Sequence, residues 1–228
     1  MRLEAEFGGI DIYLFDQLLK GRVGPGDRVL DAGCGSGRNL IYLLRSGCDV
    51  SAVDVNPHAV AEVRELAARH APGLPADRFR VEPVERLSFP DAAFTVVISS
   101  AVLHFAAGDE QFDAMVTSLW RVLAPGGMLF ARLATTIGME SRVRPLGHRR
   151  FALPDGSERY LADETMLMER TARLGGQLLD PIKTTIVQDQ RSMTTWVVRK
   201  GGVYYANSKT IVMVLLNRFQ TLVINRLF

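Results

Sequence analysis

The chain has little cysteine, with Cys34 and Cys48 as its two examples among 228 residues. Two cysteines are too few for a disulfide framework, and neither stands in a CxxC or Cys/His spacing that would predict a metal site. We therefore expect both thiols to be reduced and no metal to be bound.

Long hydrophobic runs and a marked charge excess are also missing. The N-terminal MRLEAEFGG contains charged residues and no continuous apolar segment, so we expect no secretory signal or transit peptide, and a cytoplasmic location. No run reaches the ~20 apolar residues that a transmembrane helix needs. The net charge is +2, and the last 28 residues carry three basic and no acidic side chains, so the rest is close to neutral. This balance argues against nucleic-acid binding driven by phosphate neutralisation.

Segments with strand-like and helix-like apolar periodicity alternate along residues 1–200, which we expect to form one domain. The alternation predicts an α/β, Rossmann-like, doubly wound fold with a mostly parallel seven-stranded sheet and helices on both faces. Strands are expected at 29–31, 50–54, 79–81, 95–99, after a turn at 124–127, at 184–188 and at 193–199. Helices are expected at 10–21, 38–46, 57–70, 110–123 and 163–174.

The stretch VLDAGCGSGRNL at 29–40 ends an apolar run in three alternate glycines. A dinucleotide-binding G-x-G-x-x-G fingerprint has glycine at its sixth position, where this chain has Arg38. The carboxylate of Asp31, two residues before Gly33, would repel a pyrophosphate but suits a ligand with an ammonium group and a positive sulfur. The stretch therefore favours S-adenosylmethionine over a nicotinamide dinucleotide.

An acid at the end of the next expected strand supports the same ligand. Asp54 follows Gly37 by 17 residues, enough for a helix and a return strand, and its carboxylate can accept hydrogen bonds from both ribose hydroxyls. Proteins that bind NAD also carry an acid there, so Asp54 alone does not distinguish the two cofactors. The glycine turn, Asp31 and Asp54 together favour S-adenosylmethionine.

Four segments resemble the successive motifs of class I S-adenosylmethionine-dependent methyltransferases of the type 11 kind. They are VLDAGCGSG at 29–37, AVDVNP at 52–57, FPDAAFTVVISSAVLHF at 89–105 and WRVLAPGGMLFARL at 120–133. The stretch 33–57 also resembles the small tellurite-resistance methyltransferases, which does not fix a substrate. The resemblance implies S-adenosylmethionine as the cofactor and methyl transfer to a small-molecule acceptor. A module that binds the cofactor without catalysis is the alternative.

The resemblance also implies roles for individual residues. The positions that it places around the cofactor are Asp31, Gly33, Cys34, Gly35, Gly37, Asp54, Val55, Val84, Glu85 and Ser99. Asp54 would hold the ribose, and Val84 and Glu85 would flank the adenine. Ser99, together with Ser100 next to it, would lie near the transferable methyl. Cys34 is expected to be a small filler in the glycine turn. His104 is the candidate general base, with a packing or hydrogen-bonding role as the alternative.

The segment 138–160 is a candidate substrate-side insertion, because it follows an expected strand on the side where open α/β sheets bind ligands. It contains several arginines before an expected hairpin turned by Asp155 and Gly156. Our hypothesis is that Arg149 and Arg150 bind an anionic acceptor, since arginine offers forked donors to planar anions. The alternative is a solvated face that pairs with nearby acids.

Residues 201–228 form a C-terminal apolar and basic extension of unknown role. Apolar side chains of 211–228 fall near one helical face, which is compatible with a homodimer contact or a basic interfacial helix. An extension without ordered structure is the third alternative, and the sequence does not choose among them.

Overall fold

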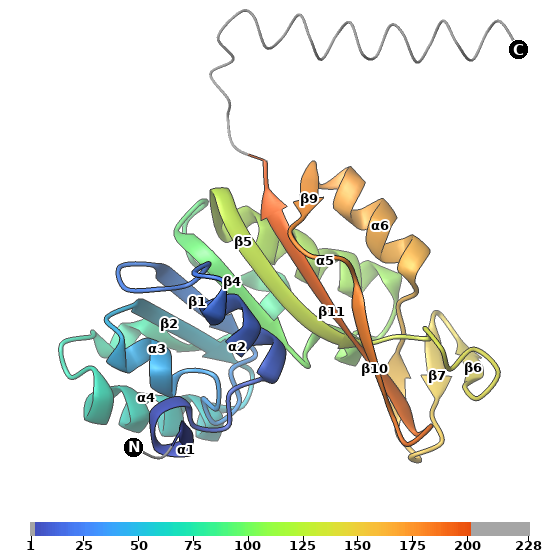
Figure 1. Cartoon of the computed structure of the whole chain (residues 1–228), viewed down its shortest axis with the longest axis horizontal. Coiled ribbons are helices and arrows are strands. Elements are labelled where there is room, and N and C mark those ends of the chain that lie inside the picture. The colour runs from blue at the N-terminus through green and yellow to red at the C-terminus, as the bar shows by residue number, and fades with distance from the viewer. Residues whose placement is uncertain (1–2, 202–228) are drawn as a thin grey trace, which may run out of the picture.

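The computed structural model describes residues 3–201, which form one mixed sheet with helices on both of its faces and a small second sheet (Figure 1). The main sheet runs in the order β10-β11-β5-β4-β1-β2-β3, and β9 also pairs with β11. Its strands are β1 (Arg28–Ala32), β2 (Asp49–Asp54), β3 (Phe79–Val81), β4 (Phe94–Ser100), β5 (Leu123–Ala134), β9 (Gly176–Leu178), β10 (Lys183–Val187) and β11 (Arg191–Lys200). Strands β1 to β5 are parallel, and β9, β10 and β11 pair antiparallel. The predicted doubly wound α/β fold is confirmed.

The helices divide between the two faces of this sheet. They are α1 (Leu3–Phe7), α2 (Ile12–Leu19), α3 (Ile41–Arg45), α4 (Pro57–His70), α5 (Asp109–Val122) and α6 (Glu164–Arg173), with short 3-10 turns η1 (Ala76–Arg78), η2 (Val84–Arg86) and η3 (Leu103–Phe105). Neighbouring residues of β5 point to different cores, because side chains alternate along a strand. Phe130 belongs to the core that contains Leu43 of α3 and Val63 of α4, whereas Leu129 belongs to the core that contains Phe112 of α5.

Most predicted elements differ from the structure by one or two residues at their ends, and two of them differ in a way that has a local cause. The helix expected from residue 38 begins at Ile41, because residues 38–40 continue the glycine turn and the N–H of Leu40 donates to the carbonyl of Gly37. The turn expected at 124–127 lies inside β5 as an irregularity. The register with β4 shifts between the pairs Phe94–Leu123 and Val96–Met128.

The segment 138–160 builds the small sheet of β6 (Arg144–Gly147), β7 (Arg150–Ala152) and β8 (Glu158–Tyr160). The predicted hairpin is present as β7 and β8, and its turn is closed by a hydrogen bond from the N–H of Gly156 to the carbonyl of Leu153. Figure 1 shows this sheet beside the ends of β10 and β11. It therefore lies on the side where the parallel strands end.

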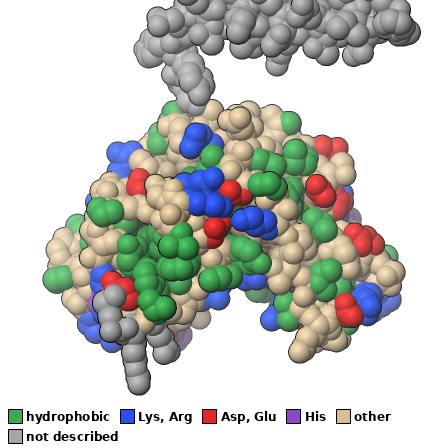
Figure 2. Space-filling view, viewed as in Figure 1, with side chains coloured by type: hydrophobic (Ala, Val, Ile, Leu, Met, Phe, Trp, Pro, Cys, Tyr) green, Lys and Arg blue, Asp and Glu red, His purple; other side chains and the backbone are tan. Residues whose placement is uncertain are grey.

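Polar side chains at and just beyond the C-terminal end of helix α2 bind Asp180, which precedes β10. The carboxylate of Asp180 accepts hydrogen bonds from Arg22, Lys20 and Gln17. Figure 2 shows hydrophobic side chains gathered over this part of the surface, where Ile12 and Leu19 are exposed. Across residues 3–201, none of the helices has the length and apolar character to cross a membrane. The predicted contacts of 211–228 lie outside the described residues.

Candidate functional site

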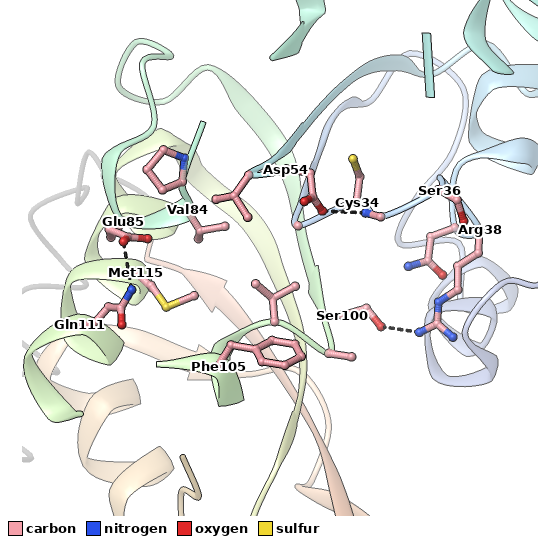
Figure 3. A pocket seen from close by; sticks show the side chains of 17 residues that line it. Cys34, Ser36, Arg38, Asp54, Val84, Glu85, Ser100, Phe105, Gln111 and Met115 are labelled. Carbon is pink, nitrogen blue, oxygen red and sulfur yellow. Dashed lines mark hydrogen bonds between the residues drawn. The ribbon is translucent and has the colours of Figure 1, made fainter. Parts of the chain in front are cut away.

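A cleft of about 620 Å³, here called the main cleft, opens where β1, β2 and β4 end (Figure 3). Its lining combines the glycine turn with residues from four later segments. The lining residues are Gly33, Cys34, Gly35, Ser36, Arg38, Asn39, Asp54, Val55, Pro83, Val84, Glu85, Ser100, Ala101, Val102, Phe105, Gln111 and Met115. Seven of the ten predicted cofactor residues lie in this set, and Asp31, Gly37 and Ser99 do not.

The glycines of the turn have different tasks. Gly33 has a φ of +82°, and a Cβ built on it would lie 2.4 Å from Cγ2 of Val102. Gly33 is therefore needed for both its backbone conformation and its close approach to a side chain of the cleft. At Gly37, a Cβ would lie 3.0 Å from side-chain atoms of Val63 and Leu66 on α4. Gly37 lets α4 pack against the turn and does not line the main cleft.

Asp54 connects the end of β2 to the glycine turn. Its Oδ2 accepts a hydrogen bond of 2.9 Å from the N–H of Gly35 (Figure 3), and its Oδ1 accepts one of 2.9 Å from the N–H of Asn56. Each carboxylate oxygen has a second lone pair, and the side chain lines the main cleft. Asp54 can therefore hold the turn in place and still accept hydrogen bonds from a ligand's hydroxyl groups.

Asp31 is a buried carboxylate without a partner. The residue is 1% exposed, and neither carboxylate oxygen has a hydrogen-bond partner within residues 3–201. Burial raises its pKa to about 7, against the attraction of Arg38. No amide of the glycine turn donates to Asp31 in the described structure, and the N–H of Gly35 donates to Asp54 instead. An orphaned carboxylate beneath the glycine turn fits a ligand that brings a positive charge to the cleft.

The far end of the main cleft is apolar with one polar edge. Val84 and Met115 are buried in its wall, and Phe105 is exposed beside them. Glu85 accepts a hydrogen bond of 3.0 Å from Nε2 of Gln111 on α5 (Figure 3). This combination suits a flat heterocycle such as adenine, which offers apolar faces and polar edges.

Ser100, rather than Ser99, faces the main cleft. Ser99 is fully buried, and its hydroxyl has no hydrogen-bond partner among the described residues. Ser100 accepts a hydrogen bond of 3.2 Å from Nη2 of Arg38 and donates one of 3.3 Å to the buried carboxylate of Asp11. The two serines differ because successive side chains of a strand alternate in direction.

His104 lies in a second cavity and is a poor general base. Its Nδ1 accepts a hydrogen bond of 3.2 Å from the N–H of Ala134. Burial, helped by the charges of Arg159, Arg132 and Arg191, lowers the pKa of His104 to about 4. The imidazole is therefore neutral near pH 7, with its proton on Nε2, because Nδ1 is the acceptor. This environment supports the alternative interpretation, a hydrogen-bonding histidine.

The second cavity, here called the arginine cavity, has a volume of about 250 Å³ and adjoins the main cleft. Its lining residues are Arg38, Ala101, His104, Arg132, Ala134, Leu153, Asp155, Ser157, Arg159, Val187, Arg191 and Met193. Arg38 and Ala101 line both spaces and so form their common wall. Four of the lining residues belong to the segment 138–160.

Arg149 and Arg150 line neither of these two spaces. Nη1 of Arg149 lies 2.8 Å from Asp163, and Nη2 of Arg150 lies 3.6 Å from Glu158. The structure thus gives both predicted anion-binding arginines acidic partners, as in the alternative of a paired, solvated face.

Cys34 lines the main cleft but has no features of a nucleophile. Burial raises the pKa of its thiol far above the usual value, and Asp31 and Asp54 add to the shift. Among residues 3–201 no group of three or more His, Cys, Asp and Glu side chains is placed to hold a metal ion. Cys34 fills space in the turn, as its small size suggests.

Comparisons with known proteins agree with this geometry. Residues 30–131 match the family model described as "Methyltransferase domain". The malonyl-[acyl-carrier protein] O-methyltransferase of Enterobacter lignolyticus is 37% identical over 108 residues, which cover 47% of this chain and 39% of that protein. The chain spans less than half the length of the first curated relatives that it matches.

Two solved structures share the fold. An S-adenosylmethionine-dependent methyltransferase of Methanosarcina mazei has a TM-score of 0.66 at 22% identity, covering 81% of this chain and 97% of its own. The 1,6-didemethyltoxoflavin-N1-methyltransferase of Burkholderia thailandensis, with that compound and S-adenosylhomocysteine bound, has a TM-score of 0.62 at 22% identity, covering 82% and 76%. Residues 30–131 therefore match a methyltransferase domain, and the described residues share the fold of S-adenosylmethionine-dependent methyltransferases.

Proposed function

We propose that this chain transfers a methyl group from S-adenosylmethionine to a small-molecule acceptor bound beside the main cleft. The observation that carries the proposal is one cleft that joins the glycine turn, the Asp54 carboxylate and the apolar wall around Val84 and Met115. The relative from Burkholderia thailandensis, which holds a small acceptor together with S-adenosylhomocysteine, supports the same arrangement.

The chain's own residues provide contacts for each part of the cofactor. Asp54 would accept hydrogen bonds from the ribose, and Val84 and Met115 would pack against the adenine. The buried Asp31 would stabilise positive charge at the methionine end, which offsets the cost of its own ionisation. S-adenosylmethionine supplies an electrophilic methyl group on a positively charged sulfur.

In this proposal the protein accelerates methyl transfer by positioning the two substrates and excluding water, and not by abstracting a proton. The neutral His104 has its Nδ1 occupied, and the carboxylates of Asp54 and Glu85 already accept hydrogen bonds. An acceptor whose attacking atom is already ionised needs no base. We therefore include an anionic acceptor in the proposed function.

The proposal is tested by two measurements on the full chain. Isothermal titration with S-adenosylhomocysteine, with NADH as a control ligand, should show micromolar binding of the first compound and none of the second. Release of S-adenosylhomocysteine from S-adenosylmethionine is then followed with a panel of small acids, thiols and phenols. Turnover with a member of the panel supports the enzyme. Binding with neither transfer to any of them nor measurable cofactor hydrolysis would instead favour a binding module.

A further inference from the structure

The arginine cavity lies between elements that are far apart in the sequence. Arg38 comes from the glycine turn, Arg132 from β5, Arg159 from β8 and Arg191 from the start of β11. Two of these arginines therefore come from the parallel core of the fold, and the other two come from the small sheet and the antiparallel edge. The cavity adjoins the main cleft through Arg38 and Ala101, so a ligand held in it would extend toward the cofactor.

The positive charge of the arginine cavity is only partly balanced. Arg132 and Arg38 share one carboxylate, that of Asp11, at 3.0 Å and 3.6 Å. Arg159 and Arg191 form no ion pair with any carboxylate in the described part of the chain. The acidic lining residue is Asp155, and its Oδ1 accepts hydrogen bonds from the N–H and the hydroxyl of Ser157.

Hydrogen-bond donors of the arginine cavity are also left without partners. Nε of Arg132 is buried and has no acceptor within residues 3–201. His104 uses Nδ1 as an acceptor toward the N–H of Ala134, so its Nε2–H is a donor. Arg159 lies over the ring of Phe105 at 4.9 Å from its centre, which holds the guanidinium at the border of the main cleft. A buried donor without an acceptor costs free energy, and an anion would supply the acceptor.

We propose that the arginine cavity is an anion subsite, which holds a carboxylate or phosphate group of the methyl acceptor while the reacting end of that acceptor lies in the main cleft. The inference rests on the proposed function and adds the place and the residues of recognition. Arg159 and Arg191 make the principal ionic contacts, because their forked donors match the oxygens of either anion and neither forms an ion pair among the described residues. The carboxylate of Asp155 attracts both arginines without pairing with either. Arg132 and the Nε2–H of His104 complete the set of donors.

The test uses the full chain saturated with S-adenosylhomocysteine and two probes, inorganic phosphate and benzoate, titrated at constant ionic strength. The variants are Arg159→Gln and Arg191→Gln. Arg144→Gln is the matched control, because Arg144 is exposed on the same small sheet, lacks an ion pair among the described residues and lines neither space. We expect each of the two cavity variants to weaken probe binding about tenfold, the loss of one charged hydrogen bond, and the control to leave it unchanged.

The outcomes separate this inference from the proposed function. Tighter binding of phosphate or of benzoate identifies which anion the acceptor carries. If neither probe binds while S-adenosylhomocysteine does, the anion subsite is wrong and the proposed function stands; if S-adenosylhomocysteine itself does not bind, the proposed function fails first. If Arg144→Gln weakened probe binding as much as the cavity variants, the effect would come from general surface charge, and the anion subsite would be wrong. Should Arg159→Gln not fold, Arg191→Gln, whose side chain is exposed, decides alone.

Discussion

The carboxylate of Asp54 and the backbone N–H of Gly35 are joined by a hydrogen bond of 2.9 Å, across 19 residues of sequence. This bond fixes the glycine turn to the end of the neighbouring strand, so one side chain both shapes the main cleft and lines it.

Replacement of Asp54 by alanine should weaken S-adenosylhomocysteine binding 10- to 100-fold, because hydrogen bonds to a charged group contribute about 1.5–3 kcal/mol. Isothermal titration measures the effect. Asp49→Asn, at the other end of β2, is the control, since Asp49 pairs with Arg78 on the surface. Its affinity should equal that of the wild type, and an unchanged affinity in Asp54→Ala would remove Asp54 from the site.

Replacement of Asp31 by asparagine should stabilise the unliganded protein at pH 8 and not at pH 4. The folded pKa of Asp31, about 7, lies above the ordinary value of 3.8, so its favourable contribution is complete below pH 3.8 and is lost as the pH rises through 7. The neutral amide of the asparagine does not ionise, so the variant keeps this free energy of unfolding, at most on the order of 4 kcal/mol. Thermal unfolding at both pH values measures it. The same variant should bind S-adenosylhomocysteine more weakly, and equal stabilisation at both pH values would contradict the assignment.

Replacement of Gly33 by alanine should destabilise the fold by about 2 kcal/mol or more, because the positive φ and the overlap with Val102 both oppose a Cβ. Urea unfolding gives the value. The double variant Gly33→Ala, Val102→Ala relieves the overlap and leaves the backbone strain, so it should lose less than the sum of the two single variants. Strict additivity would show that Val102 is not the obstacle.

The buried His104 should make the protein sensitive to acid. Its folded pKa, about 4, lies below the ordinary value of 6.5, so its contribution to stability is complete above pH 6.5 and is lost as the pH falls toward 4. A His104→Asn variant should lose stability relative to the wild type at pH 7.5, and this difference should shrink at pH 4.5. Chemical unfolding at the two pH values provides the comparison. A constant difference would mean that the pKa of His104 is not lowered in the folded state.

The sequence could predict those site residues whose position follows from local structure. Asp54 ends a strand whose apolar pattern is visible, and Gly33 and Gly35 stand in a turn whose spacing is itself the signal. Gln111 and Met115 carry no such signal, since they reach the cleft only because α5 packs across η2 and β5.

Arginines show the same limit more sharply. Arg149 and Arg150 were predicted to bind an anion because they belong to a cluster of arginines in the sequence. In the folded hairpin they pair with Asp163 and Glu158. Arg159, on the other strand of that hairpin, reaches the cavity, and Arg191 joins it from a distant strand. Which arginine meets which acid is decided by strand pairing, and charge density along the chain does not report it.

Arg38 lines both the main cleft and the arginine cavity, so ligands in the two spaces would contact the same side chain. A ligand in the arginine cavity that draws the guanidinium away from Asp11 and Ser100 also alters the surface that the cofactor meets. Linkage is reciprocal, so whatever factor the anion imposes on cofactor affinity, the cofactor imposes on the anion. The order in which the two substrates bind, and the release of the demethylated cofactor afterwards, would then be governed by one side chain that belongs to both.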